Sequence, residues 1–324
     1  MWDFSIGQAL ALMARTAPFV LFRVLVYFAV SAAFVVVTGT GAGIGYGVGL
    51  FGDEEFRTSA TVYGAIGGFG LTAGVIFFLR DYLLYLVKAG HLAVMVELME
   101  GREVPGGQGQ VAWAQGVVRE RFGTASALFG LDVLIRGVVG AVTGLLQGIL
   151  SFLPIPGLDR LAAALRAYLK IAAGLIDEVI LAQILRTRSD NPWKTGQEAL
   201  VLYAQNARPL LVNAAWLTLI VWVLSLLVFL VMLAPAAAVV WLIPGPATGG
   251  MMVFAILFAW AVKAALIEPF ALACLLQVYF KVTAGQQPDP DWTARLSQAS
   301  DKFRSLGEKA AGWVSGRRSA PPAA

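Results

Sequence analysis

The sequence predicts an all-α fold: a polytopic transmembrane helical bundle of about six spans, built around a parallel internal helix-loop-helix duplication. Two observations lead there. Of the 324 residues, 58% are hydrophobic and only 14% are charged, whereas about a quarter of a soluble chain is charged. The mean hydropathy is +0.74, and the apolar residues fall into runs close to the ~20 residues that cross a bilayer. Such a chain cannot bury its apolar surface in water, so a membrane domain over residues 1–285 is favoured.

Six apolar segments are the candidate spans, and they follow an amphipathic stretch, Trp2 to Thr16. They are Ala17–Val37, Ser59–Leu79, Gly123–Leu153, Leu158–Leu185, Pro209–Ile243 and Met251–Phe280. The fifth has no charge and exceeds one crossing, so it tilts, bends near Pro235 or includes a re-entrant piece. The fourth carries six charges, so a buried or interfacial helix is the alternative there.

The distribution of Lys and Arg predicts the orientation. With the N-terminus inside, the inner segments carry 17 such residues and the outer ones two, Arg57 and Arg160. Because cytoplasmic loops of inner-membrane proteins hold the excess of cations, both termini are expected to be cytoplasmic, in a cell inner membrane. The same rule explains the net charge of +4 without a nucleic-acid partner, and none is expected.

An internal repeat relates residues of about 79–122 to residues of about 165–209. Leu79-Arg80-x-Tyr82-Leu83 is echoed by Leu165-Arg166-x-Tyr168-Leu169, and Pro105-x3-Gly-Gln-x-Ala by Pro192-x3-Gly-Gln-x-Ala, at offsets of 86 and 87. Two crossings separate the two loops, so the repeats are parallel. Parallel repeats occur in transporters and also in proteins that transport nothing.

The composition changes at residues 286–324, which are expected to form a cytoplasmic tail. Five apolar residues fall close to one helical face: Trp292, Leu296, Phe303, Leu306 and Trp313. Two interpretations remain open, an amphipathic helix lying on acidic headgroups and a loosely ordered solvated tail.

Charges inside apolar spans are the candidate pathway or substrate-binding residues, since each costs roughly 2.5–3.5 kcal/mol to insert. Asp132 and Arg136 are four residues apart and suit each other along one helix face. Lys263 and Glu268 are five apart, about 140° around an α-helix, so partners on another helix are expected. We therefore expect Glu268 near Arg136 and Lys263 near Asp132, either as structural neutralisation or as a polar pathway.

Asp177 and Glu178 form a second candidate pair. Adjacent carboxylates point about 100° apart on a helix, so one neighbour cannot pair with both. One of them faces either a water-filled vestibule, where it would attract a cation or carry a proton, or simply the cytoplasmic interface.

No motif indicates an enzyme, and no catalytic residue, metal or cofactor is expected. One cysteine, Cys274, and one histidine, His91, cannot build a His/Cys zinc site. The sequence contains no GxSxG, HExxH, Walker or CxxC motif.

Glycine spacing points to close helix packing or a homo-oligomer. Gly140, Gly144 and Gly148 form a GxxxGxxxG run, and Gly64/Gly68 and Gly70/Gly74 add two GxxxG pairs. Between Gly39 and Gly52 glycine recurs at nearly every second residue, which should destabilise a helix. We expect a flexible or re-entrant external segment there, with a glycine-lined pore element as the alternative.

Several short stretches between residues 80 and 310 resemble the choline transporter-like family. They are Val104-Pro105, Arg121 to Ser126, Leu175-Ile176-Asp177-Glu178, Gly196 to Asn206 and Gln277-Val278-Tyr279-Phe280. An equally good resemblance is to uncharacterised prokaryotic multi-pass proteins with duplicated helix-loop-helix units. The choline transporter-like resemblance implies movement of a cationic organic solute. Trp216, Trp222 and Trp260 are candidates for cation contact or interfacial anchors.

The function expected from the sequence is therefore that of a transporter or permease-like protein for a small, cationic organic solute. The alternative is a non-transporting membrane scaffold that self-associates and holds a partner or a lipid surface.

Overall fold

The computed structural model describes residues 2–79, 84–105, 109–122, 133–135, 137–138, 140, 176–242 and 248–318. Every regular element in these ranges is a helix. The chain divides into two compact units. The first holds Met1–Thr16, Lys88–Leu219 and Phe270–Ala324, and the second holds Ala17–Val87 and Ile220–Pro269.

Four helices among the described residues are long and apolar enough to cross a membrane. They are Ala17–Gly49, Glu54–Phe78, Ala207–Leu242 and Gly250–Val282. They contain the first and sixth predicted spans and all but the last residue of the second and fifth. Most of the third predicted span and most of the fourth lie outside the described residues. Six spans and the internal duplication therefore remain predictions, while the all-helical membrane class is confirmed.

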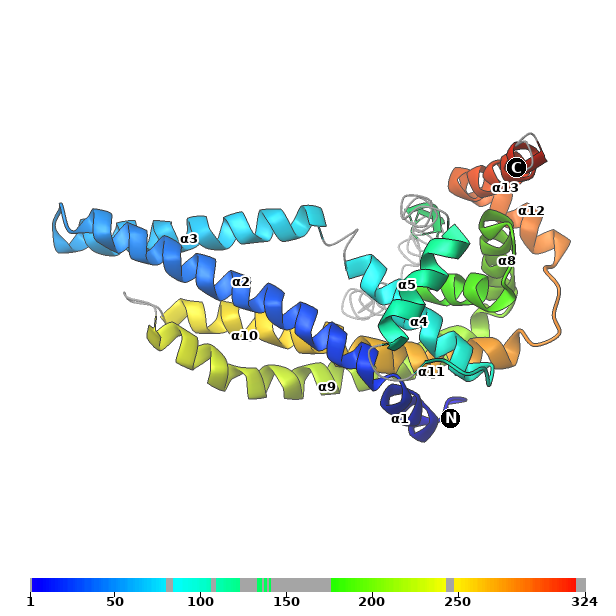
Figure 1. Ribbon diagram of the computed structural model, residues 1–324, viewed down its shortest axis with the longest axis horizontal. Coiled ribbons are helices and arrows are strands. Elements are labelled where there is room, and N and C mark those ends of the chain that lie inside the picture. The colour runs from blue at the N-terminus through cyan, green and yellow to red at the C-terminus, as the bar shows by residue number, and fades with distance from the viewer. Residues whose placement is uncertain are drawn as a thin grey trace, which may run out of the picture. The chain divides into compact units, whose positions relative to one another are not determined.

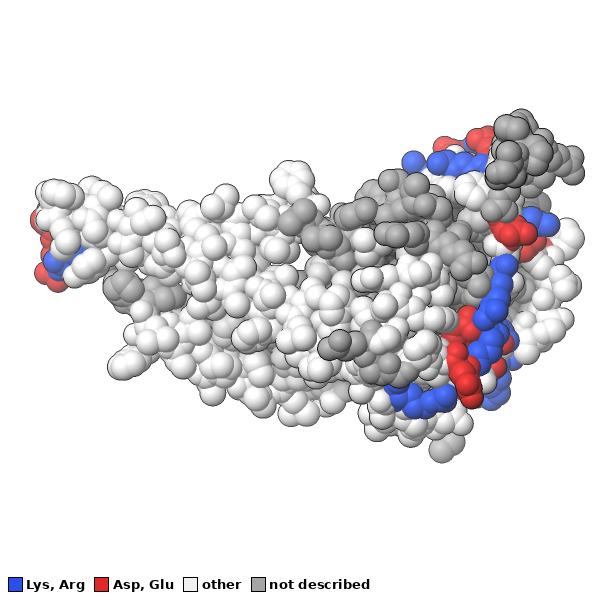
Figure 2. All heavy atoms as spheres, in the orientation of Figure 1, with Lys and Arg blue, Asp and Glu red and all other residues white. Residues whose placement is uncertain are grey.

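The second unit is built on a hairpin of α2 (Ala17–Gly49) and α3 (Glu54–Leu79), which run side by side (Figure 1). Asp53 caps α3, because its Oδ1 accepts a hydrogen bond from the backbone N–H of Phe56 at 2.8 Å. In the space-filling view the turn end of the hairpin carries acidic and basic atoms, and the rest of its visible face is free of them (Figure 2). Arg23, the one charged residue of α2, is buried. That distribution suits helices surrounded by lipid.

Glycines hold the hairpin helices close together. A Cβ added at Gly41 or Gly45 would overlap the backbone of α3, at Gly64 and Ala60 respectively, and one at Gly68 would overlap Val37 of α2. The expectation of a flexible or re-entrant segment at Gly39–Gly52 is wrong, because α2 remains helical through Gly49. Close packing against α3 compensates for the low helix propensity of glycine.

The second unit also contains the later part of α9 (Ala207–Leu242) and α10 (Thr248–Val262). Pro235 lies inside α9, where its missing N–H and its ring weaken the regular hydrogen bonding. Beside it, Ala236 is buried with Phe254 and Ala255 of α10. After α10 the same long helix continues through a π-helical turn, Lys263–Ile267 (η2), into α11 (Glu268–Val282).

The first unit surrounds α4 (Tyr85–Met99). The ten consecutive residues 89–98 are all buried, including the polar His91 and Glu97, so protein surrounds this helix on every side. Most of residues 179–185, in the helical segment 176–187, and of residues 271–280, in α11, are buried as well. The unit further contains α1 (Ile6–Arg15), α5 (Gly109–Phe122) and α8 (Pro192–Gln205).

Residues after 286 form two helices, α12 (Pro290–Ala299) and α13 (Asp301–Arg318), which pack against α8 (Figure 1). Their apolar face is buried within the unit through Leu296, Phe303 and Leu306. The segment thus belongs to the first unit, and the division at 286 between a membrane domain and a cytoplasmic tail remains a prediction. An amphipathic tail lying on lipid would need this face to be free, and here α8 occupies it.

Candidate functional site: a charged cluster at a π-helical turn

The most unusual backbone of the second unit is the π-helical turn between α10 and α11. The N–H of Glu268 donates to the carbonyl of Lys263, five residues back. The carbonyl of Ala264 therefore loses its α-helical donor, and its π-helical donor would be residue 269, which is proline and has no N–H. One carbonyl inside an apolar helix is thus left without a backbone partner.

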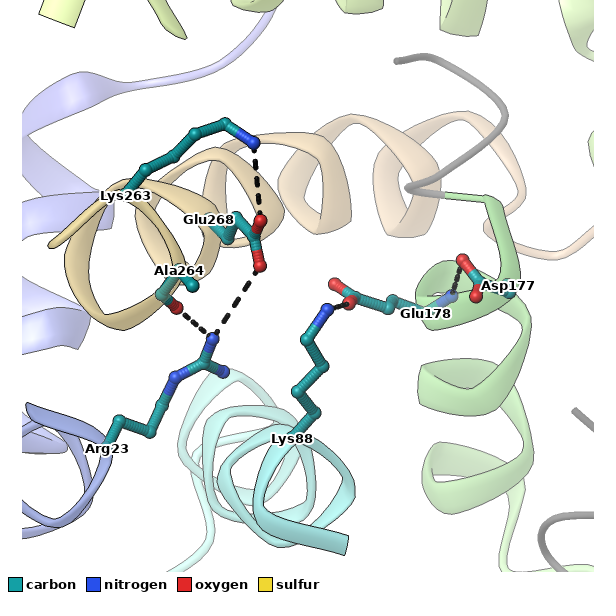
Figure 3. Close-up of polar contacts among 7 residues, drawn as sticks. All are labelled: Arg23, Lys88, Asp177, Glu178, Lys263, Ala264 and Glu268. Carbon is teal, nitrogen blue, oxygen red and sulfur yellow. Dashed lines mark hydrogen bonds and ion pairs between the residues drawn. The ribbon is translucent and has the colours of Figure 1, made fainter. Parts of the chain in front are cut away.

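Arg23 of α2 supplies the missing donor. Its Nη2 donates a hydrogen bond to the carbonyl oxygen of Ala264 (Figure 3). The same Nη2 lies 4.0 Å from Oε2 of Glu268, and only 4% of the Arg23 side chain is exposed. A buried guanidinium needs both a counter-ion and hydrogen-bond acceptors, and the π-helical turn provides one of each.

Lys263 and Glu268 form an ion pair across the same turn, with Nζ and Oε1 3.3 Å apart (Figure 3). An α-helix would hold them about 140° apart, which is why partners on another helix were expected. In a π-helix the repeat is i to i+5, so residues five apart lie above one another. The local backbone thus brings together two residues that α-helical geometry would separate.

The surroundings of the cluster are apolar. Tyr27, Ala261, Ala264 and Ala265 form a buried cluster, and the ring of Trp260 meets Tyr27 edge-on at 5.4 Å. Lys263 and Glu268 nevertheless keep 38% and 24% of their side chains exposed. Because hydrocarbon contact with a charge is costly, these exposed parts require water or lipid headgroups beside them.

The other candidate residues have different surroundings. In the first unit, Oε1 of Glu178 pairs with Nζ of Lys88 at 3.0 Å, and the backbone N–H of Glu178 donates to Oδ1 of Asp177 at 3.0 Å (Figure 3). Asp132 and Arg136 lie outside the described residues, so their expected pairing with Lys263 and Glu268 remains a prediction.

A second ionic network in the first unit joins the end of α4 to the end of helix 176–187. Glu97, with 6% of its side chain exposed, accepts hydrogen bonds from Nε of Arg102 and from Nη2 of Arg188, the latter at 2.6 Å. Glu100 accepts from Nε of Arg186 at 2.7 Å. Burial alone would raise the pKa of Glu97, but the bonds from Arg102 and Arg188 outweigh it and lower that pKa.

Arg188 has a positive φ of 51°, a left-handed conformation that is uncommon for a residue other than glycine. It follows directly after helix 176–187, and its bond to Glu97 helps to hold that conformation. The network fastens two loops that the predicted duplication would make equivalent, since Glu100 and Arg186 are 86 residues apart.

Sequence reasoning missed Arg23 and this network. Arg23 was visible as a lone charge within the first predicted span, and Pro269 as a proline directly after the intramembrane Glu268. Glu97, Glu100 and Arg102 are unremarkable in sequence, because helix-end charges are usually solvated. Groups of His, Cys, Asp or Glu that could hold a metal ion are absent from the described part of the chain.

The four long apolar helices among the described residues indicate a membrane protein. No protein-family model, curated protein or solved structure matches the chain. The geometry of its own residues is therefore the basis for any functional proposal.

Proposed function

We propose that the protein is a transporter or permease-like protein for a small organic solute, with the Arg23–Lys263–Glu268 cluster beside its pathway. The observation that carries the proposal is the exposure of Lys263 and Glu268 in the middle of an apolar helix. Charges in that position need a polar environment. A hydrated path through the membrane domain supplies one, and interrupted helices with nearby charges are typical of transporter binding sites.

The cluster has the chemistry for a polar solute. Glu268 can accept hydrogen bonds or balance a cationic group, and it lies beside the opposite charges of Arg23 and Lys263. A π-helical turn suits such a site, since π-bulges are frequent at functional positions. The resemblance to choline transporter-like proteins makes a cationic organic solute the first to test.

Hydration is tested with cysteine substitutions in a Cys274→Ala background, which removes the only native thiol. Lys263→Cys is compared with Ile256→Cys, an exposed position on the apolar helix α10. In proteoliposomes we expect a membrane-impermeant thiol reagent to modify residue 263 much faster than residue 256. Equal, slow reaction at both positions would remove the basis for a pathway here.

Transport itself is tested by uptake of labelled choline into the same proteoliposomes. Glu268→Gln should abolish uptake that the unaltered chain supports, whereas Glu198→Gln should not. Glu198 is a suitable control because 42% of its side chain is exposed and its ion pair among the described residues is with Lys194 of the same helix, at 3.7 Å.

The second candidate is a non-transporting membrane scaffold, and the ion pairs themselves favour it. Arg23 and Lys263 both share Glu268, so the cluster has its own charge compensation and can serve packing alone. A dry residue 263 together with no choline uptake would select this candidate.

A further inference from the structure

We infer that α1 is an interfacial anchor whose outer face lies in the headgroup region of a bilayer and favours acidic phospholipids. The inference concerns the N-terminal residues of the first unit and does not depend on transport. It starts from the distribution of apolar side chains around this short helix.

Helix α1 has two apolar faces, of which the protein covers only one. Ala9 and Leu12 are buried in the first unit. Ile6 and Leu10 remain exposed, Leu10 by 56%, and with Met13 they lie within about 60° of one another at 100° per residue. Gln8 and Arg15 lie on the opposite side, roughly 180–200° from Ile6. The uncovered apolar stripe and its polar back are the pattern of a helix lying in a membrane interface.

The chain places this stripe at the ends of candidate spans. The backbone N–H of Asp3 donates to Oδ1 of Asn213 at 2.6 Å, and that of Ser5 donates to Oε1 of Gln277 at 2.9 Å. Asn213 lies in the second turn of α9, and Gln277 lies near the end of α11. Helix α2, another candidate span, begins at Ala17, two residues after α1 ends. The start of α1 is thereby fixed at the level where these helices would leave the hydrocarbon.

Aromatic and basic residues at this level complete the anchor. Trp2 lies edge-on to Trp216 of α9, with ring centroids 5.7 Å apart, and both rings are about 40% exposed. Tryptophan is enriched at membrane interfaces. Arg15, Arg208 and Lys281 are exposed at the ends of α1, α9 and α11, and Asp3 is 3.9 Å from Lys281. The excess of cations matches a surface of acidic headgroups.

The depth of α1 is measured with nitroxide labels on the full chain in bilayer nanodiscs, again in the Cys274→Ala background. One label replaces Leu10 and a matched one replaces Gln8, an exposed residue of the polar side. We expect the Leu10 label to collide preferentially with oxygen at shallow membrane depth, and the Gln8 label with a water-soluble nickel complex. Equal access of both labels to the nickel complex would overturn the inference. Shielding of the Leu10 label from both reagents would also overturn it, since a second copy or a protein partner would then cover the stripe.

The preference of α1 for acidic phospholipids is tested separately in the same nanodiscs. Replacing phosphatidylcholine in part by phosphatidylglycerol should move the Leu10 label deeper. Arg15→Gln combined with Lys281→Gln should abolish that shift, and Lys194→Gln, an exposed cation on α8, should leave it unchanged. A shift that survives the double substitution would refute the role of these two cations.

Discussion

One backbone carbonyl, that of Ala264, accounts for an arginine inside an apolar helix. The π-helical turn and Pro269 together remove its backbone donors, and Arg23 replaces them. Either feature alone would be unfavourable. Arg23 would be a costly buried charge, and the carbonyl of Ala264 would be an unpaired acceptor. Their combination makes each tolerable in an apolar environment.

Removing this donor should destabilise the second unit. Arg23→Leu leaves the carbonyl unpaired, which we expect to lower the unfolding free energy by about 1–3 kcal/mol. Pro269→Ala restores an N–H at the π-helical donor position, so the double variant should lose less than Arg23→Leu alone. Thermal unfolding in detergent measures both. A double variant that behaves as the sum of the singles would show that the carbonyl does not couple them.

Glu97 predicts a pH dependence of stability in the first unit. Its pKa is lowered below the ordinary 4.5 in the folded chain, so its ion pairs stabilise fully above about pH 4.5. That contribution disappears as the pH falls through the lowered pKa. We expect Glu97→Gln to be less stable at neutral pH by about 1–3 kcal/mol, the value of hydrogen bonds to a charged group, and to lose less on acidification.

Unfolding experiments in detergent, at pH values from neutral to about pH 3, measure this difference in stability between the variant and the unaltered chain. Glu198→Gln is the control, because the Glu198 side chain is partly exposed and, in the part of the chain that the structure describes, its ion pair is with Lys194 of the same helix. If Glu97→Gln and the unaltered chain lost stability in parallel on acidification, Glu97 would not be the titrating group.

At the scale of single residues, the sequence predicted which charged residues lie in apolar helices better than it predicted which residues they contact. Lys263 and Glu268 were identified as intramembrane charges, but their mutual pairing depends on a π-helical repeat that hydropathy does not encode. Arg23 was overlooked because a long side chain near a span end usually reaches the interface. Only the position of Pro269 in three dimensions shows why this arginine is buried.

Among the helices, the α2–α3 hairpin shows that the effect of a glycine depends on its position. A glycine that faces the partner helix allows close packing, whereas one that does not face it only lowers helix propensity. Gly41 and Gly45 face α3 at distances that leave no room for a Cβ, whereas a Cβ added at Gly43 would meet nothing within 4 Å outside its own stretch of helix. Judged by helix propensity alone, the repeated glycines suggested that this segment would not form a stable helix. Because glycine recurs at nearly every second residue, glycines lie on all sides of the helix. The sequence therefore does not reveal which of them face α3.

The two classes of glycine should respond oppositely to alanine. Gly45→Ala places a methyl group against the carbonyl of Ala60 and should cost about 1–3 kcal/mol through overpacking. Gly43→Ala meets open space and should be neutral or stabilise the helix by up to ~1 kcal/mol. Thermal unfolding of the two variants in one detergent is a matched comparison. Equal losses would mean that helix propensity, and not the contact with α3, governs this segment.

For the whole molecule, hydropathy correctly predicted the all-helical membrane class, and four of its apolar segments coincide with helices long and apolar enough to cross a bilayer. It could not predict that residues 290–318 join the first unit. An amphipathic helix has the same pattern whether its apolar face meets lipid or protein. The partner of that face is α8, with Nε1 of Trp313 donating to the carbonyl of Asp190 and Nδ2 of Asn191 to that of Ala310, both at 2.8 Å.

The docking of α13 on α8 should depend on Phe303, which is fully buried. Phe303→Ala removes a large side chain from this contact and should cost about 3–5 kcal/mol, enough to release the C-terminal helices while the membrane helices stay folded. Limited trypsin digestion in detergent should then cleave at Lys302, Arg304 and Lys309 much faster than in the unaltered chain. Glu308→Ala, an exposed change on the same helix, should leave the rate unchanged. If Phe303→Ala were also cut no faster, α13 would be held mainly by the polar bonds of Asn191 and Trp313.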